Sequence, residues 1–299
     1  MNYSELLYEK YKEALKSFAD FPLMDKEQFA EYASVQLKDM DCIIIENDGQ
    51  TGFMFYETSE DEDALHCYIP VCGCYAETEQ MITRLFSKLA EDIVRDKPVH
   101  FSVRLFAGNT DWIEAFHMMQ FGTIAETCAK KLETEPEEMT LPYDIKVLSK
   151  PELEERWDSV WAAVHGIVAH LQGSPVFYPG TEFTEEVYRG FFMDEGVEVI
   201  GAFERGTLVG IIEWNREADS LLCGEKSVNV GEAYVKPSLR GNGLAEALLK
   251  TAEKNAKSAG ADLMWVEHGT ANPNARGFWN KYFKTYKYEL VRTVEPVRI

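Results

Sequence analysis

The sequence predicts a mixed α/β fold in two domains. Three observations support this prediction. Short apolar runs that alternate with polar residues are typical of strands, whereas longer runs with apolar residues at i, i+3 and i+4 are typical of helices. Both kinds of run follow one another in a similar order in residues 1–135 and 143–299. A charged stretch with two prolines, residues 133–142, separates them and suits an exposed linker.

The first domain, residues 1–135, begins with two predicted helices, for which Ser4 and Asp25 are suitable N-caps. The pair Asp48-Gly49 predicts a hairpin turn. The predicted elements are helices at 4–19, 26–39, 78–95 and 112–119, and strands at 42–46, 52–56, 65–75, 99–105 and 123–131.

The second domain, residues 143–299, repeats much of this order, with a hairpin around Arg205-Gly206. We interpret the chain as a tandem repeat of one fold; an unrelated α/β first domain is the alternative. The predicted elements are strands at 144–148, 197–203, 208–214, 228–235, 262–267 and 286–294, and helices at 153–171, 183–192, 245–256 and 275–282.

A glycine-rich turn joins strand 228–235 to the helix that follows it. Pro237 ends the strand, because proline cannot donate to a sheet ladder, and Arg240-Gly241-Asn242-Gly243 form the turn. The first amides of a helix have no partner within the helix, and the helix dipole places partial positive charge there. Glycines let an anion approach the backbone closely. We therefore expect a pyrophosphate at this turn; the alternative is a turn that binds no ligand.

The turn does not fit the dinucleotide-binding pattern GxGxxG, and the chain contains no Walker GKS or GKT. It fits Arg/Gln-x-x-Gly-x-Gly/Ala, which is filled by Arg240, Gly243 and Ala245. This motif resembles the acyl-CoA loop of the GNAT acetyltransferase superfamily, and the resemblance extends from about Tyr143 to the C-terminal end. The flanking residues that agree with it are Val235, Pro237, Asn274, Ala275 and Phe278.

The resemblance implies tandem GNAT-like domains, each with a mixed, mostly antiparallel sheet flanked by helices. It also implies acyl transfer from acetyl-CoA, as cosubstrate, to an amine. In the family, the strand before the loop pairs its backbone with the pantetheine arm, and an amide there can stabilise the developing oxyanion. For Asn274, a role as a helix N-cap is the alternative, and both roles can hold together. The implied cofactor-binding residues are Tyr234, Val235, Arg240, Gly241, Asn242, Gly243, Leu244, Ala245 and Asn274.

The reaction also needs a neutral amine, whereas a lysine-type amine is largely protonated at neutral pH. Glu232 is the candidate base, because alternation along the strand places it on one face with Val230 and Tyr234. A carboxyl among apolar neighbours has a raised pKa, and the family often has Glu or Asp here. The alternative is that Glu232 binds the charge of the acceptor or a neighbouring arginine. The reserve candidates are Glu213, Glu267 and His268.

The reaction also needs a proton donor to the departing thiolate. Many family members have a Tyr directly after the aromatic residue of the last helix, where this chain has Phe278-Trp279. An indole N–H donates a hydrogen bond but is a poor proton source. Tyr282, three residues on, is the candidate catalytic substitute; the alternatives are packing by both aromatic residues and protonation by water.

The acceptor amine is expected over residues from the first helix of the second domain and its loop. These positional candidates are Trp161, His165, His170 and Tyr178.

The first domain lacks the acyl-CoA loop. Where the loop is expected, the chain reads Cys74-Tyr75-Ala76-Glu77-Thr78-Glu79. Glu77 and Glu79 would satisfy the helix dipole themselves and repel a pyrophosphate. We predict that this domain has lost cofactor binding and acts as a scaffold or shapes the acceptor cleft.

The composition and the net charge limit the classes of molecule that the protein is expected to bind. A net charge of −21 argues against nucleic acid and anionic membranes and permits a cationic amine from a small molecule or peptide. The six cysteines contain no CxxC pair, so we expect buried structural residues and no metal. The charged N-terminal segment is not a signal peptide, and no apolar run is long enough to span a membrane. We expect a cytoplasmic monomer or homodimer.

The sequence is compatible with three functions. An acyl-CoA-dependent N-acetyltransferase fits best. A non-catalytic acyl-CoA-binding sensor or scaffold is the alternative, favoured by the missing tyrosine and disfavoured by Glu232. A nucleotide-binding domain is third, because its fingerprints are absent.

Overall fold

The computed structural model describes residues 3–47, 49–133, 141–173, 184–222 and 224–296. It is a mixed α/β structure with largely antiparallel sheets flanked by helices, which confirms the predicted fold class. The chain forms two compact units. The first unit comprises Met1–Cys128, His268–Thr270 and Thr285–Ile299, and the second comprises Ala129–Glu267 and Ala271–Lys284.

The sheet of the first unit has the strand order β1-β2-β3-β5-β12-β6, with β4 paired to β2. Apolar residues from one face of β3, β5 and β12 form a core with α3 and α4. The strands are β1 (Asp41–Asn47), β2 (Gln50–Glu60), β3 (Leu65–Ile69), β4 (Cys74–Ala76), β5 (Val99–Phe106), β6 (Gly122–Lys131) and β12 (Lys284–Val294), and the helices are α1 (Tyr3–Ala14), α2 (Lys26–Gln36), α3 (Glu79–Ile93) and α4 (Thr110–Met118).

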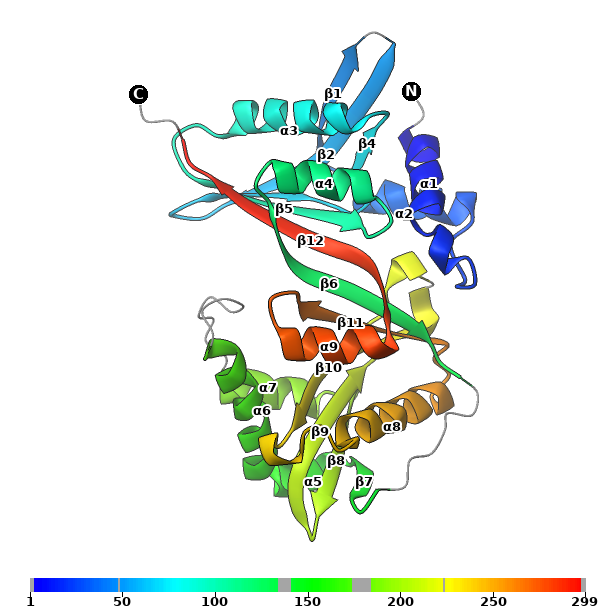
Figure 1. The fold of residues 1–299 in the computed structure, drawn as a ribbon, viewed down its shortest axis with the longest axis vertical. Helices are drawn as coiled ribbons and strands as arrows, with labels where there is room; N and C mark the ends of the chain where they lie inside the picture. The colour runs from blue at the N-terminus through cyan, green and yellow to red at the C-terminus, as the bar shows by residue number, and fades with distance from the viewer. Residues whose placement is uncertain (1–2, 48, 134–140, 174–183, 223, 297–299) are drawn as a thin grey trace. The chain divides into compact units, whose positions relative to one another are not determined.

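The last strand of the chain belongs to the first unit. The red strand β12 runs antiparallel to β5 in Figure 1, with Lys287–Val294 opposite Val99–Phe106. The sequence placed this strand in the domain 143–299. Local patterns do not reveal a strand's partner, so this pairing was not visible from them. The boundaries 1–135 and 143–299 stay a prediction about the division of function.

Two predicted elements are broken in the structure. The expected strand 65–75 is divided into β3 and β4, because the turn from Pro70 to Gly73 interrupts it with a bond from the Gly73 amide to the Pro70 carbonyl. The expected helix 153–171 is two helices that meet at Arg156, which has non-helical backbone angles. The first of these helices starts earlier than predicted, because Ser149 and Glu152 form a capping box.

The sheet of the second unit has the order β7-β8-β9-β10-β11, antiparallel except where β10 runs parallel to β11. Alternation along β9 points Ile211 into the core under α6 and α7, whereas Gly210 faces Leu248 of α8. Helices therefore cover both faces. The strands are β7 (Asp144–Leu148), β8 (Val197–Glu204), β9 (Thr207–Asn215), β10 (Ser227–Val235) and β11 (Leu263–Gly269), and the helices are α5 (Lys150–Glu155), α6 (Trp157–Gln172), α7 (Glu185–Met193), α8 (Leu244–Ser258) and α9 (Pro273–Tyr282).

The remaining expectations concern cysteines and membranes. Of the five described cysteines, four are buried and none forms a disulfide. Within the described ranges, no helix has both the length and the apolar character needed to cross a bilayer. The predicted linker 133–142 lies mostly outside the described residues.

Candidate active site

Strand β10 separates from its neighbour β11 after a short paired stretch. Only Ser227–Asn229 pair with Leu263–Trp265. On its other edge, β10 stays paired with β9 as far as Val235. Beyond Asn229, therefore, the β11-facing edge of β10 has no strand partner among the described residues. An open strand edge of this kind can accept an extended ligand through backbone hydrogen bonds.

A bulge interrupts β10 where it separates from β11. Val230 lies opposite Trp214 and Ala233 opposite Ile212, so β10 has one more residue here than β9. A bulge of this type redirects the side chains beside it. The extra length falls at Gly231 and Glu232.

Glu213 of β9 holds the bulge. Its Oε1 accepts a hydrogen bond from the amide of Glu232 at 3.0 Å and also receives the amide of Gly231. A Cβ at position 231 would overlap the same oxygen, so any larger residue there would force the Glu213 carboxylate to shift. Glu213 is 1% exposed, and its Oε2 has no hydrogen-bond partner among the described residues. Burial raises the pKa of this carboxyl to about 7, against the opposing effect of the Glu232 amide.

Glu232 points to a second group of residues, on helices α6 and α7. The hydroxyl of Tyr188 donates to Glu232 Oε1 at 3.1 Å. The Glu232 side chain is partly exposed, yet it lies deep enough among protein atoms for burial to raise its pKa. The Tyr188 ring lies 6.2 Å from that of Trp161, measured between centroids. At Gly166, α6 approaches β10 so closely that a Cβ would overlap the ring of Tyr234.

The glycine turn after β10 leads directly into α8. Gly241 and Gly243 have φ angles of 81° and 82°, in the left-handed region that favours glycine. Gly243 is the N-cap of α8, and no side chain caps this helix start. The Arg240 side chain donates from Nε to the carbonyl of Val235 at 3.1 Å, and Leu244 is buried. The turn therefore presents backbone amides of α8 without a side-chain acceptor.

Residues 151–284 match the family model described as Acetyltransferase (GNAT) family. These residues form a GNAT domain. Members of this family generally use acetyl-CoA and act on amine acceptors, so the family supports acyl transfer as the general reaction. A search of curated proteins finds no match to the sequence.

Solved structures are similar to almost the whole chain. A GCN5-related N-acetyltransferase from Sphaerobacter thermophilus matches with a TM-score of 0.56 at 14% identity, covering 98% of this chain and 93% of that one. A second such protein, from Kribbella flavida, matches with a TM-score of 0.45 at 13% identity, covering 91% and 96%. A tandem GNAT protein from the clavulanic acid biosynthesis pathway gives a TM-score of 0.46 at 12% identity, covering 100% and 97%.

The candidate acid of the GNAT domain, Tyr282, is hydrogen-bonded to a residue in the first turn of α8. Its hydroxyl donates to Glu246 Oε2 at 2.6 Å, and Lys281 Nζ lies 2.7 Å from the hydroxyl oxygen. Burial and the Glu246 carboxylate raise the pKa of Tyr282. The same bond, with help from Lys281, lowers the pKa of Glu246. Trp279, which stands where the family has its usual tyrosine, is buried.

The alternative role of Asn274, as the N-cap of the last helix of the GNAT domain, is wrong. Asn272 is the N-cap of α9, and its side chain accepts from the amides of Asn274 and Ala275 at 3.2 and 3.3 Å. The helix starts earlier because Pro273 suits the first helical position. The Asn274 side chain lies 3.5 Å from His170 Nε2. A contact between Asn274 and the cofactor stays a prediction.

The remaining candidates are dispersed. Glu267 is exposed on β11, whereas His268 is buried and belongs to the first unit. His165 is exposed one helical turn from Trp161, at 5.9 Å between ring centroids. Tyr178 lies outside the described residues. Of the reserve residues, the structure therefore places only Glu213 in contact with Glu232.

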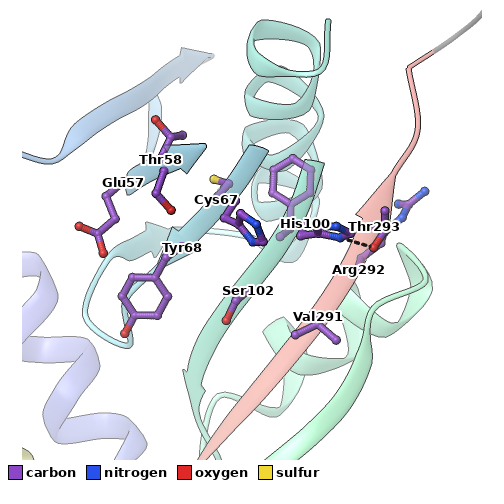
Figure 2. A pocket seen from close by; sticks show the side chains of 12 residues that line it. Glu57, Thr58, Cys67, Tyr68, His100, Ser102, Val291, Arg292 and Thr293 are labelled. Carbon is purple, nitrogen blue, oxygen red and sulfur yellow. Dashed lines mark hydrogen bonds between the residues drawn. The ribbon is translucent and has the colours of Figure 1, made fainter. Parts of the chain in front are cut away.

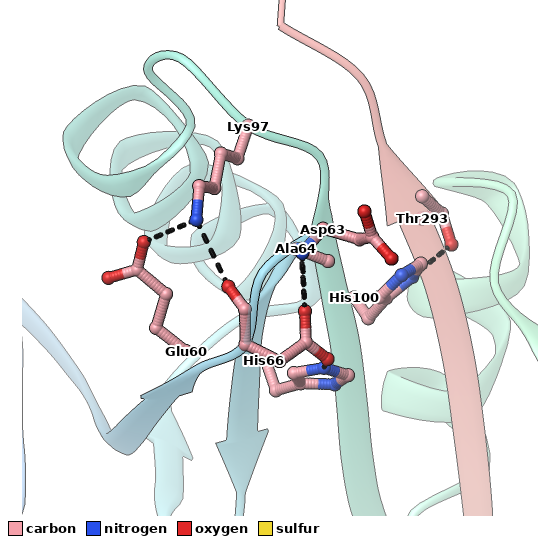
Figure 3. A network of polar contacts seen from close by, with 8 residues as sticks. Glu60, Asp63, Ala64, His66, Lys97, His100 and Thr293 are labelled. Carbon is pink, nitrogen blue, oxygen red and sulfur yellow. Dashed lines mark hydrogen bonds and ion pairs between the residues drawn. The ribbon is translucent and has the colours of Figure 1, made fainter.

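The first unit has a pocket that the sequence did not predict. It has a volume of about 480 Å³ and lies on the sheet face opposite α3, with walls from β2, β3, β5 and β12 (Figure 2). His66 and His100, paired across β3 and β5, lie 5.2 Å apart between ring centroids. Asp61 bonds to His66 at 2.8 Å and Thr293 to His100 at 2.7 Å (Figure 3). The sequence shows a histidine in each of two predicted strands. It does not show that these two strands pair.

Proposed function

We propose that the chain is an acetyl-CoA-dependent N-acetyltransferase that acts on an amine of a small molecule or peptide. One observation carries this proposal: the open edge of β10 leads into the uncapped start of α8. An extended thioester arm and a diphosphate need these two features in this order. The GNAT match supports the general reaction, whereas the acyl group and the acceptor are our inference.

The cofactor is proposed to bind through the backbone. The amides from Gly241 to Ala245 face the pyrophosphate, because they lie at the positive end of the α8 dipole. Glu246, in the same turn, is compensated by Lys281 at 3.3 Å and Lys250 at 3.7 Å. The pantetheine arm lies along β10 at Tyr234 and Val235, where it adds a strand to the open edge.

Glu232 is proposed to receive the proton of the acceptor ammonium. Its raised pKa brings it closer to neutral pH, and its partial exposure lets an amine reach it. The neutral amine nitrogen then bonds to the thioester carbon, and the carbon–sulfur bond breaks to release CoA thiolate. The proton that remains on the nitrogen is lost to solvent water, which leaves the neutral amide. Glu213 is buried and is used by the bulge amides, so we assign it the positioning of Glu232 rather than contact with the substrate.

Tyr282 is the proposed proton donor to the departing thiolate. Its raised pKa keeps it protonated at neutral pH, and its bond to Glu246 holds it beside the first turn of α8. That same bond favours the second candidate function, an acyl-CoA-binding sensor without turnover, because the hydroxyl is already occupied.

Thiol release from acetyl-CoA, measured across a panel of amines, separates the two functions. The transferase predicts amine-dependent release that falls strongly in Glu232→Gln, while the acetyl-CoA affinity measured by calorimetry stays within about twofold. Glu204→Gln, an exposed carboxyl at the end of β8, is the control that should behave as wild type. Binding of acetyl-CoA with no amine-dependent release would favour the sensor instead.

A further inference from the structure

Three metal-ligand types meet inside the first unit, apart from the acetyltransferase site. Glu126 and Cys128 point from β6, and His268 comes from the end of β11. Their exposed fractions are 1%, 0% and 7%. All three residues belong to the first unit. No signal in the sequence joins them, since His268 follows Cys128 by 140 residues.

The donor atoms are spaced as ligands of one small ion would be. Cys128 Sγ lies 3.8 Å from His268 Nε2, which lies 3.5 Å from Glu126 Oε1. All three atoms lie within 4.8 Å of one another. In a tetrahedral zinc site, Zn–S of about 2.3 Å with Zn–N and Zn–O of about 2.0–2.2 Å place such ligand pairs roughly 3.4–3.6 Å apart. The observed spacing needs only small movements to reach this geometry.

Neighbouring contacts hold these ligands in place. The Thr270 amide donates to the Ile124 carbonyl at 3.0 Å, which fixes the segment after His268 beside β6. The Thr285 hydroxyl donates to Glu126 Oε2 at 3.1 Å and lies 3.3 Å from Cys128 Sγ. Hydrogen bonds around the ligands are typical of metal sites, because they orient the donor atoms.

The donor types select the ion. A thiol and an imidazole favour zinc over magnesium or calcium, which prefer sets of oxygen ligands. Glu126 is 1% exposed, and its carboxylate can ligate zinc together with the thiolate and the imidazole.

We propose that the first unit binds one Zn²⁺ through Glu126, Cys128 and His268, with water as the fourth ligand. Because His268 comes from the far end of the chain, whereas Glu126 and Cys128 lie on β6, the ion would fasten the segment His268–Thr270 to β6. The role that we assign to the ion is to hold together segments that lie 140 residues apart in the sequence. The proposal does not depend on acetyl transfer.

Cobalt substitution tests the site on the full-length chain. After removal of metal with a chelator, Co²⁺ should bind at one equivalent per chain and give a thiolate-to-cobalt charge-transfer band, which Zn²⁺ then abolishes. Cys128→Ser should lose the band and bind Co²⁺ more than about 100-fold more weakly. This loss exceeds the one that is typical when a residue that only hydrogen-bonds to a metal ligand is replaced. Cys67→Ser, which removes another buried thiol of the same unit, is the matched control and should keep both.

Absence of the band in the wild type, or its persistence in Cys128→Ser, would overturn the proposal. If Cys128→Ser does not fold, Glu126→Gln decides, because the amide keeps the shape of the carboxyl. Weaker Co²⁺ binding with the thiolate band retained would support the site, and unchanged affinity would refute it. Zn²⁺ should also raise the unfolding temperature of the wild type and not that of Glu126→Gln.

Discussion

Two helices that follow strands begin in different ways. Helix α8 starts at Leu244, directly after Gly241 and Gly243 with their left-handed backbone, and no side chain caps it. Helix α3 starts after Thr78, whose backbone is extended, with exposed carboxylates at Glu77 and Glu79. Both starts follow a strand and neither N-cap residue makes a side-chain cap, yet only the start of α8 has glycines with left-handed backbone. Backbone conformation and local charge, more than the order of elements, therefore separate a proposed anion site from a plain helix start.

The largest expected effect comes from making the α8 turn resemble that of α3. Gly243→Glu adds a carboxylate at the pyrophosphate site and places a side chain at a φ of 82°, which costs about 1–2 kcal/mol for a non-glycine residue. We expect acetyl-CoA affinity to fall by at least about 100-fold, or about 2.7 kcal/mol, in calorimetric titration.

Gly206→Glu is the matched control for this change. Gly206 also has a left-handed φ, of 81°, and lies in the exposed hairpin turn between β8 and β9. The same charge and strain there should lower stability and leave acetyl-CoA affinity unchanged. If both variants lost affinity equally, the α8 turn would have no special role.

A smaller effect, on the pH dependence of the free energy of unfolding, is expected from the difference between the strands that precede the two helices. Strand β10 is continuous and has a bulge held by Glu213, whereas the strand before α3 is broken at Pro70. Because the pKa of Glu213 is raised from 4.5 to about 7, the folded state keeps a proton that the unfolded state releases. The free energy of unfolding should therefore fall as pH rises from 4.5 to 7 and level off above it, by at most about 3 kcal/mol.

Urea unfolding between pH 4.5 and 8 measures this contribution. Glu213→Gln mimics the protonated carboxyl and should show a flatter dependence on pH than the wild type. Glu204→Gln, an exposed carboxyl in the same sheet, should keep the wild-type slope. Equal slopes in wild type and Glu213→Gln would show that this carboxyl does not titrate as described.

The smallest effect is expected when the start of α3 is made more like the start of α8. Removing both charges with Glu77→Gln and Glu79→Gln should create no second acetyl-CoA site, because no glycine there has left-handed backbone. Loss of Glu79 from the first turn should cost about 0.3–1 kcal/mol of stability. Glu91→Gln, near the other end of α3, should have the opposite sign. A second equivalent of bound acetyl-CoA in the double variant would show that charge alone prevents the cofactor from binding at the start of α3.

The sequence was informative where function depends on consecutive residues. The run from Arg240 to Ala245 was enough to place an uncapped helix start after a strand, because backbone conformation there follows from local glycines. Glu232 was placed on the correct strand, but the alternation that put it on one face with Val230 and Tyr234 is wrong. The bulge leaves Val230 opposite Trp214 and Tyr234 opposite Ile211, so these two residues lie on opposite faces of the sheet. The fold class followed from the same local patterns.

The sequence was uninformative where residues meet across strands. The contact of Glu213 with the bulge depends on the register of β9 against β10, which no local pattern fixes. The pairing of β12 with β5 and the approach of His268 to Cys128 depend on long-range packing. Asn274 failed as an N-cap for a local reason, since Pro273 moves the start of α9 by two residues.

A crystal structure of the full-length chain with acetyl-CoA tests the central claim most directly. The account predicts one cofactor per chain, with its diphosphate on the amides of residues 241–245 and its pantetheine arm along β10 at Tyr234 and Val235. A cofactor in the pocket of the first unit, or at the start of α3, would contradict it.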